Sequence, residues 1–143
     1  MALWLCKQEP DCYGFDDLAR DGTTQWDGVS NALARKHLRQ MRTGDRVFFY
    51  HTGKEKAVVG EMVVAGEPRP DPKGDDEAAV TVEMKAVRKL PRPVSLAEIK
   101  ADKSLAGWDL VRLPRLSVVP VTDAQWRRVE ALARGPGPKT ASK

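Results

Sequence analysis

Apolar residues along the chain gather in short blocks whose spacing distinguishes strands from helices. Blocks rich in aromatic and β-branched residues predict strands over residues 45–53 and 56–66, and strict alternation predicts another over 78–87. Because these three strands follow one another without an intervening helix, we expect an antiparallel meander. Apolar segments over residues 2–7 and 115–121 predict two more strands.

Pairs of polar residues three positions apart mark where two helices begin. Ser95 precedes Glu98, and Thr122 precedes Gln125, which is the spacing of a capping box. In such a box, two side chains satisfy backbone N–H groups that the first helical turn leaves unpaired. We therefore expect one helix to open at Ser95 and an amphipathic helix to span residues 122–134. Two further helices are expected over residues 15–22 and about 30–41.

Strands and helices do not alternate along the chain as they would in a βαβ fold, so the expected fold class is α+β. We expect a small, curved, mostly antiparallel sheet or open barrel with short helices around it. The chain of 143 residues has the length of one domain. Residues 67–77 contain three prolines and a cluster of acids, which predicts an exposed loop. The small and basic residues 135–143 predict a disordered tail.

Composition argues against several classes of protein. No segment approaches the ~18–20 consecutive apolar residues of a membrane span, and the N-terminal apolar stretch is too short for a signal peptide. We therefore expect a cytoplasmic protein, most simply a monomer, with no membrane partner. The spacing of Cys6 and Cys12 matches no zinc or redox motif, so no metal or cofactor is expected. The net charge is +4, and Lys139 and Lys143 supply two of these charges, so charged partners must be sought in local clusters.

One tryptophan stands apart from the apolar blocks. Trp26 lies between Gln25 and Asp27 in a polar stretch, and Gly28 follows. No helical or strand period places it on a core face, so two interpretations stay open: a plug over the core, or a flat wall on which a planar ligand stacks. Stacking a base on an aromatic ring contributes ~1–3 kcal/mol, and a neighbouring glycine lets a ligand approach the backbone.

The helix expected after Trp26, capped by Ser30 or Asn31, carries two stripes at helical spacing. The apolar stripe, which we expect to face the core, comprises Ala34, Leu38 and Met41. The basic ridge one position further along comprises Arg35, Arg39 and Arg42. A ridge of this kind is either a solvated surface or a contact for phosphate groups.

Polar residues also gather where two of the expected strands end. Lys7, Gln8 and Glu9 follow the first strand, and Tyr50 and His51 close the strand over 45–53. A histidine in that position invites assignment as a general base. However, no serine or cysteine nucleophile stands in a recognisable motif, and one histidine makes no triad. We therefore expect His51 to form hydrogen bonds and no residue to be catalytic.

Several motifs in order resemble one known family. They are WLCKQEP at 4–10, WDGVSNALAR at 26–35, GDRVFFYH at 44–51, LPRPVSLAEIK at 90–100 and RLSVVPV at 115–121. On these motifs the chain resembles EVE-domain proteins over residues 3–133, almost its whole length. The resemblance implies one EVE domain over residues 1–134, with a PUA-like fold related to YTH domains.

The resemblance also implies a function. EVE domains are thought to bind modified DNA bases, such as 5-methylcytosine and its oxidised forms, in an aromatic-walled pocket. Carried over onto the matching motifs, the base-binding pocket would comprise Lys7, Gln8, Glu9, Trp26, Val29, Ser30, Asn31, Tyr50, His51, Leu116 and Ser117. The phosphate contacts would come from the basic ridge, Arg35, Arg39 and Arg42.

The chain departs from the family pattern in two places. Ser30 stands where the family has an arginine, and Arg35 or Arg39 would replace the contact of that arginine only in part. Residues 67–79 contain no aromatic residue, so no second aromatic wall is expected from that region.

We therefore expect a non-enzymatic reader of modified bases in nucleic acid, DNA in preference to RNA. Three alternatives stay open. One is a module that binds modified or structured RNA. Another is an enzyme that processes a nucleotide or nucleoside, with Glu9 or His51 as acid or base. The third is a sensor of a free nucleoside, whose binding would not depend on salt as backbone contacts do.

Overall fold

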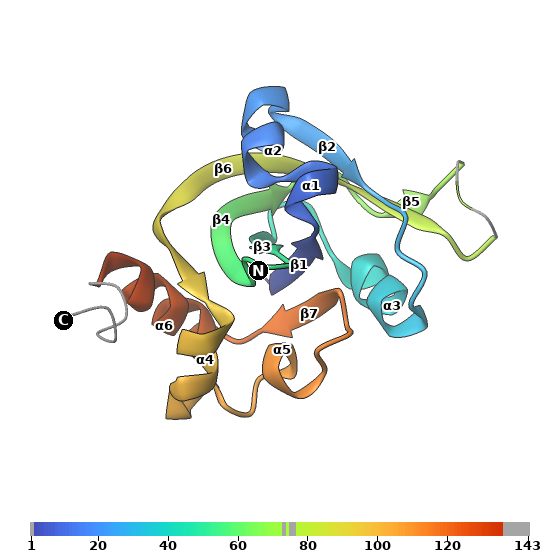
Figure 1. The fold of residues 1–143 in the computed structure, drawn as a ribbon. Coiled ribbons are helices and arrows are strands. Elements are labelled where there is room, and N and C mark those ends of the chain that lie inside the picture. The colour runs from blue at the N-terminus through green and yellow to red at the C-terminus, as the bar shows by residue number, and fades with distance from the viewer. Residues whose placement is uncertain (1, 73, 75–76, 136–143) are drawn as a thin grey trace.

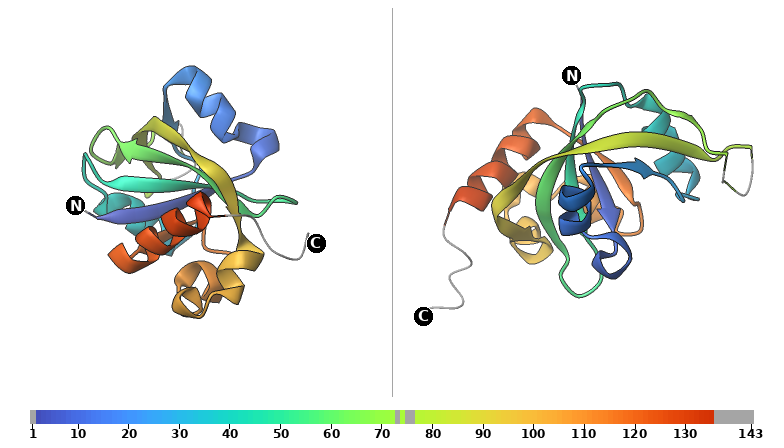
Figure 2. Two further views of the ribbon diagram at one scale, coloured as in Figure 1. Left: turned by 90° about the vertical axis from the view of Figure 1, so that its left-hand side faces the viewer. Right: turned by 90° about the horizontal axis from the view of Figure 1, so that it is seen from above.

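A strongly curved sheet surrounds the core, and short helices pack around it (Figures 1 and 2). The computed structural model describes residues 2–72, 74 and 77–135. The strands are β1 (Leu3–Gln8), β2 (Thr23–Trp26), β3 (Arg46–His51), β4 (Ala57–Val64), β5 (Arg69–Pro70), β6 (Val80–Ser95) and β7 (Val118–Val121). The helices are α1 (Pro10–Tyr13), α2 (Phe15–Asp21), α3 (Ala32–Gln40), α4 (Leu96–Ala101), α5 (Asp109–Arg112) and α6 (Asp123–Arg134), with a 3₁₀ turn η1 (Lys103–Leu105).

The sheet of the described residues has the hydrogen-bonded order β2–β6–β4–β3–β1–β7, and β5 pairs with β6 beside this path. β1 and β3 run parallel, whereas the other paired strands are antiparallel. The expected α+β class with a mixed, mostly antiparallel curved sheet is therefore confirmed. Parallel pairing has a consequence for the site, because it brings the carboxyl ends of β1 and β3 to the same edge of the sheet.

The predicted meander is confirmed, because β3, β4 and β6 are antiparallel neighbours. The strand predicted over 78–87 is longer than expected and continues to Ser95. Pro91 and Pro93 argue against a strand there, since proline cannot donate to the ladder. Both prolines lie where the register between β4 and β6 shifts, between the pairs Gly60↔Lys89 and Val58↔Val94, so neither has to donate.

Two predicted features of the helices are confirmed at atomic detail. Ser95 and Thr122 both form the expected capping boxes, with Glu98 and Gln125 respectively. At α3 the cap is Asn31, whose Oδ1 accepts a hydrogen bond from the N–H of Ala34 at 3.0 Å. The apolar stripe of α3 is fully buried, as expected: Ala34, Leu38 and Met41.

A buried carboxylate ties α6 to the sheet. Glu61 on β4 accepts from Nε of Arg46 on β3 at 2.7 Å and from Nε of Arg88 on β6 at 3.1 Å. Both arginines also reach Glu130 on α6, at 3.4 and 2.8 Å. Because Glu61 is only 3% exposed, these hydrogen bonds replace the water that the carboxylate loses on folding.

Three further expectations concern the cysteines, a membrane span and the C-terminal tail. Cys6 is buried and Cys12 is exposed, and both are free thiols. No helix in the described part of the chain is long and apolar enough to cross a membrane. The expected tail, 135–143, lies outside the described residues except for Gly135.

Gly60 allows α2 to approach the sheet. A Cβ atom at this position would lie 2.5 Å from Cε1 of Phe15, the buried first residue of α2. The register of β4 against β6 also shifts beside Gly60, so this glycine marks both a bulge and a close approach within the strand.

We predict that Gly60→Ala lowers the free energy of unfolding by ~1–3 kcal/mol, because the added methyl group overpacks the core against the Phe15 ring. Chemical denaturation followed by circular dichroism measures this change. Gly107→Ala is the matched control, because a Cβ atom at Gly107 would meet nothing within 4 Å. Equal stability of the two variants would contradict the assigned packing.

Candidate functional site

Trp26 lies inside the protein and not at the mouth of a cleft. It is the last residue of β2, pairs with Val82 of β6, and is 4% exposed. Its ring meets the ring of Phe49 edge to face, with centroids 5.4 Å apart and an interplanar angle of 90°. Of the two interpretations of Trp26, the plug over the core is therefore confirmed and the open stacking wall is wrong. The reason is strand alternation, which points Gln25 outward and Trp26 into the core.

The residues that follow Trp26 line a hollow of about 340 Å³, here called the loop hollow. One side is formed by the loop before α3, and the other by the hairpin that connects β5 to β6. The loop contributes Asp27, Gly28, Val29 and Ser30, α3 contributes Arg35, and the hairpin contributes Asp71, Gly74, Ala79 and Val80. The buried Trp26 therefore anchors the start of this loop, and the residues that follow it line the hollow.

The loop is held in place from both ends. Arg35 reaches back from α3, and its Nε donates to the carbonyl of Val29 at 2.6 Å. The Asn31 cap fixes the start of the helix. Gly28 has a φ of +73°, in the left-handed region where a side chain would be strained. The backbone facing the hollow is thus preorganised before any ligand arrives.

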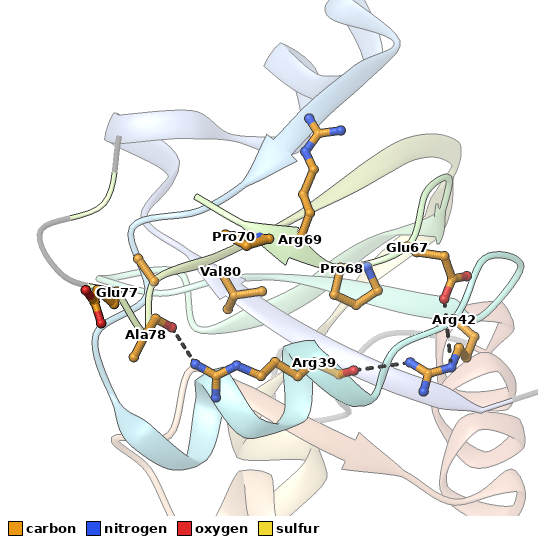
Figure 3. A pocket seen from close by; sticks show the side chains of 10 residues that line it. Arg39, Arg42, Glu67, Pro68, Arg69, Pro70, Glu77, Ala78 and Val80 are labelled. Atoms are coloured by element: carbon orange, nitrogen blue, oxygen red, sulfur yellow. Dashed lines mark hydrogen bonds and ion pairs between the residues drawn. The ribbon is translucent and has the colours of Figure 1, made fainter. Parts of the chain in front are cut away.

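Two arginines of the basic ridge, Arg39 and Arg42, line a second hollow of about 460 Å³, here called the arginine groove (Figure 3). Arg39 donates to the carbonyl of Ala78 in the hairpin, and Arg42 lies 3.8 Å from the carboxylate of Glu67. The ridge is therefore not a simple solvated face, because Arg39 ties the β5–β6 hairpin to α3 and Arg42 lies beside Glu67, just before β5. The groove shares Ala79 and Val80 with the loop hollow, so the two hollows adjoin.

The contact between Arg42 and Glu67 is exposed, with 65% and 59% of the two side chains accessible to water. Glu67 also accepts hydrogen bonds from N and Oγ1 of Thr43, both at 2.9 Å. These bonds hold the pKa of the Glu67 carboxyl below its usual value. An exposed ion pair contributes little, ~0–1 kcal/mol, so another anion can replace Glu67 beside Arg42 at small cost.

The ends of β1 and β3 bring Lys7 and Tyr50 together, as adjacent residues in the parallel register. The Lys7 Nζ lies 5.6 Å from the centroid of the Tyr50 ring and donates to the carbonyl of Pro114 at 3.0 Å. Burial lowers the pKa of the Lys7 ammonium and raises the pKa of the Tyr50 phenol to about 12. The N–H of Lys7 also bonds to the carbonyl of Ser117 at 2.9 Å. This cluster fixes the segment before β7.

His51 lies on the opposite face of β3 from Tyr50, against Phe49. Its Nε2 accepts from the N–H of Phe15 at 3.0 Å, so the ring proton belongs on Nδ1, which is 2.7 Å from Oε1 of Glu55. The expected hydrogen-bonding role of His51 is therefore confirmed, and it positions α2. Gln8, the neighbour of His51 in the register, uses its Oε1 to accept from its own next N–H, that of Glu9.

A third hollow, of about 340 Å³, lies at the start of α3 and is here called the apolar hollow. Its walls come from the first turn of α3 and from the segment between α5 and β7. They comprise Asn31, Leu33, Arg112, Leu113, Pro114, Arg115 and Leu116.

The structure thus distributes the expected site over several places. The loop hollow collects Val29, Ser30 and Arg35, and the apolar hollow collects Asn31 and Leu116. The structure does not bring the remaining expected pocket residues into either hollow: Lys7, Gln8, Glu9, Trp26, Tyr50, His51 and Ser117. Sequence reasoning missed the hairpin residues and the arginines of the apolar hollow, although "VRLPRL" at 111–116 mixes arginine and leucine just before a family motif.

A sequence profile described as "EVE domain" matches residues 2–132. This chain belongs to the EVE domain family. Human thymocyte nuclear protein 1 is 32% identical to it over 163 residues, which cover 90% of this chain and 72% of the human protein. The mouse protein of that name is also 32% identical, over 86% of this chain and 70% of its own length.

Several solved structures superpose on this chain over almost its whole length. Protein Atu2648 from Agrobacterium tumefaciens is 35% identical, with a TM-score of 0.89 and coverage of 96% and 97% of the two chains. Human THYN1 protein, crystallised in complex with 5-methylcytosine-containing DNA, is 31% identical, with a TM-score of 0.86 and coverage of 96% and 100%. The ASCH protein of Zymomonas mobilis, 12% identical with a TM-score of 0.61, shares the fold.

We predict that Trp26→Ala lowers the free energy of unfolding of this EVE domain by ~3–5 kcal/mol, because it empties a core position. Trp26→Phe should cost less, since a ring still meets Phe49. Urea denaturation measures both, with Val87→Ala, at a 50% exposed position on β6, as the control. A Trp26→Ala protein as stable as the wild type would contradict the burial of the indole.

Proposed function

We propose that this EVE domain binds modified bases in DNA, of the 5-methylcytosine type, and does so without catalysis. The observation that carries the proposal is the similarity to human THYN1, a protein crystallised with 5-methylcytosine-containing DNA, over 96% of this chain. The proposal places the modified base in the loop hollow and not on the face of Trp26.

Three properties of the loop hollow support this placement. Its size falls within the ~300–1,000 Å³ of small-molecule pockets. Val29 and Ala79 provide apolar surface for a methyl group, while Asp27 and Ser30 provide polar groups for the edge of a base. The loop is held by Arg35 and the Asn31 cap, so little ordering is needed on binding.

The adjoining arginine groove supplies positive charge for the DNA backbone. Arg39 and Arg42 lie on its α3 side, and Arg69 on its hairpin side is exposed. A phosphate that enters the groove competes with Glu67 for Arg42, and the loss of that exposed pair is a small cost. Backbone binding of this kind releases counterions, so affinity should fall as salt rises. That salt dependence separates this proposal from the sensing of a free nucleoside.

Binding without catalysis is favoured by the contacts of His51. Its Nε2 accepts a hydrogen bond from the N–H of Phe15, and its Nδ1 is hydrogen-bonded to the carboxylate of Glu55. His51 is also not among the residues that line the loop hollow. Modified RNA stays the alternative ligand for the same hollow. The cytoplasmic location and the monomeric state expected from the sequence stay predictions.

The test measures binding of one short oligonucleotide with and without a single 5-methylcytosine. A methyl group that leaves water contributes ~0.8 kcal/mol, so we predict about four-fold tighter binding of the methylated oligonucleotide. Arg35→Gln should weaken binding of both, because the loop loses its contact at Val29. Arg127→Gln on α6, away from the hollows, is the control with the same charge change. Equal affinity for the two oligonucleotides, or tighter binding of an RNA of the same sequence, would contradict the proposal.

Ser30→Arg offers a gain-of-function arm of the same experiment. It restores the arginine of the family motif at the rim of the loop hollow. We expect tighter binding of both oligonucleotides and an increase of about 1 in the slope of log affinity against log salt concentration.

A further inference from the structure

The apolar hollow has a different character from the other two hollows beside α3. Leu33 is 41% exposed and Leu113 is 36% exposed, and only one other large hydrophobic residue in the described part of the chain is exposed to this extent. Both leucines line this hollow, together with the buried Leu116. Exposed apolar side chains that gather in one hollow favour an interaction site there.

The wall opposite α3 is fixed by contacts with the core. The Lys7 ammonium holds the Pro114 carbonyl at 3.0 Å, and the N–H of Leu116 bonds to the carbonyl of Leu113 at 3.0 Å. The segment therefore turns tightly between α5 and β7, with Leu116 as its anchor in the core. These hydrogen bonds give this wall of the apolar hollow a defined conformation.

The charge of the apolar hollow is also distinct. Arg112 and Arg115 are exposed on its rim, and no acid is among its described lining residues. The loop hollow has Asp27 and Asp71, and the arginine groove has Glu67 and Glu77. Arg112 does pair with Asp109 at 2.9 Å, but 59% of its side chain is exposed, so the pair is weak. A phosphate is thus repelled least at this rim.

The position of the hollow identifies its occupant. Ser30 lines the loop hollow and its chain neighbour Asn31 lines the apolar hollow, so the two hollows lie beside consecutive residues at the start of α3. A strand with one base in the loop hollow therefore carries its neighbouring nucleotide past the start of α3.

The geometry points to a subsite for the nucleotide that flanks the modified base, in which its sugar and base pack against Leu33 and Leu113 and its phosphate contacts Arg112 and Arg115. The inference rests on the proposed function, because it needs the modified base in the loop hollow. It predicts that part of the affinity for DNA comes from one flanking nucleotide and not from the modified base.

The experiment compares two ligands: 5-methyldeoxycytidine monophosphate, and a single-stranded oligonucleotide with 5-methylcytosine at its centre. The variant Arg112→Gln/Arg115→Gln should bind the oligonucleotide about ten-fold more weakly and reduce the salt slope by about 0.7, the value for one phosphate contact on a single strand. It should bind the mononucleotide as the wild type does. Leu33→Ser should weaken oligonucleotide binding without changing the salt slope.

The control is Lys100→Gln/Arg127→Gln, with the same charge change on α4 and α6, and thermal unfolding verifies that each variant folds. The subsite is overturned if the wild type prefers the methylated oligonucleotide but the arginine variant binds it like this control. It is also overturned if the arginine variant loses mononucleotide and oligonucleotide binding equally, because the hollow would then hold the modified base itself. If the wild type binds neither ligand, the proposed function fails and the subsite fails with it.

Discussion

The edge-to-face contact between Trp26 and Phe49 is the constraint on which the candidate site depends. It fixes the end of β2 in the core, so the chain must leave the sheet at Asp27 and turn toward α3. Without that anchor, the loop that lines the hollow would have a free end and would have to be ordered by its ligand. Trp26 thus contributes to the site by stabilising the fold, whereas the smaller residues that follow it line the loop hollow.

The same division between anchoring and contacting residues holds elsewhere around α3. Arg35 holds Val29, Lys7 holds Pro114, and Arg39 holds Ala78, each by donating to a backbone carbonyl of a neighbouring loop. Three cations therefore define the walls of three hollows. A lysine or arginine has several N–H donors, so one that donates to a carbonyl can also contact a phosphate. A structural role of these residues is therefore compatible with a role in binding.

Sequence periodicity predicted what depends on near neighbours in the chain. The buried stripe of α3, the two capping boxes and the meander follow from spacings of one to four residues and are confirmed. The position of Trp26 could not be found in this way, because β2 is four residues long and its partner Val82 lies far along the chain. The contact of Arg39 with Ala78, and the position of Leu33 and Leu113 in one hollow, likewise depend on how distant segments pack. The family motifs indicated Val29, Ser30 and Asn31, but only the structure assigns Val29 and Ser30 to the loop hollow and Asn31 to the apolar hollow.

The central claim is that the loop after Trp26, and not its indole, faces the ligand. A titration with an oligonucleotide that carries 5-methylcytosine, followed by NMR of backbone amides and indole N–H groups, tests it most directly. The account predicts that the amide signals of Gly28, Val29 and Ser30 shift, together with the Arg35 side chain, while the Trp26 indole signal stays in place. Shifts confined to the α4 and α6 side of the protein, with the loop unaffected, would contradict it.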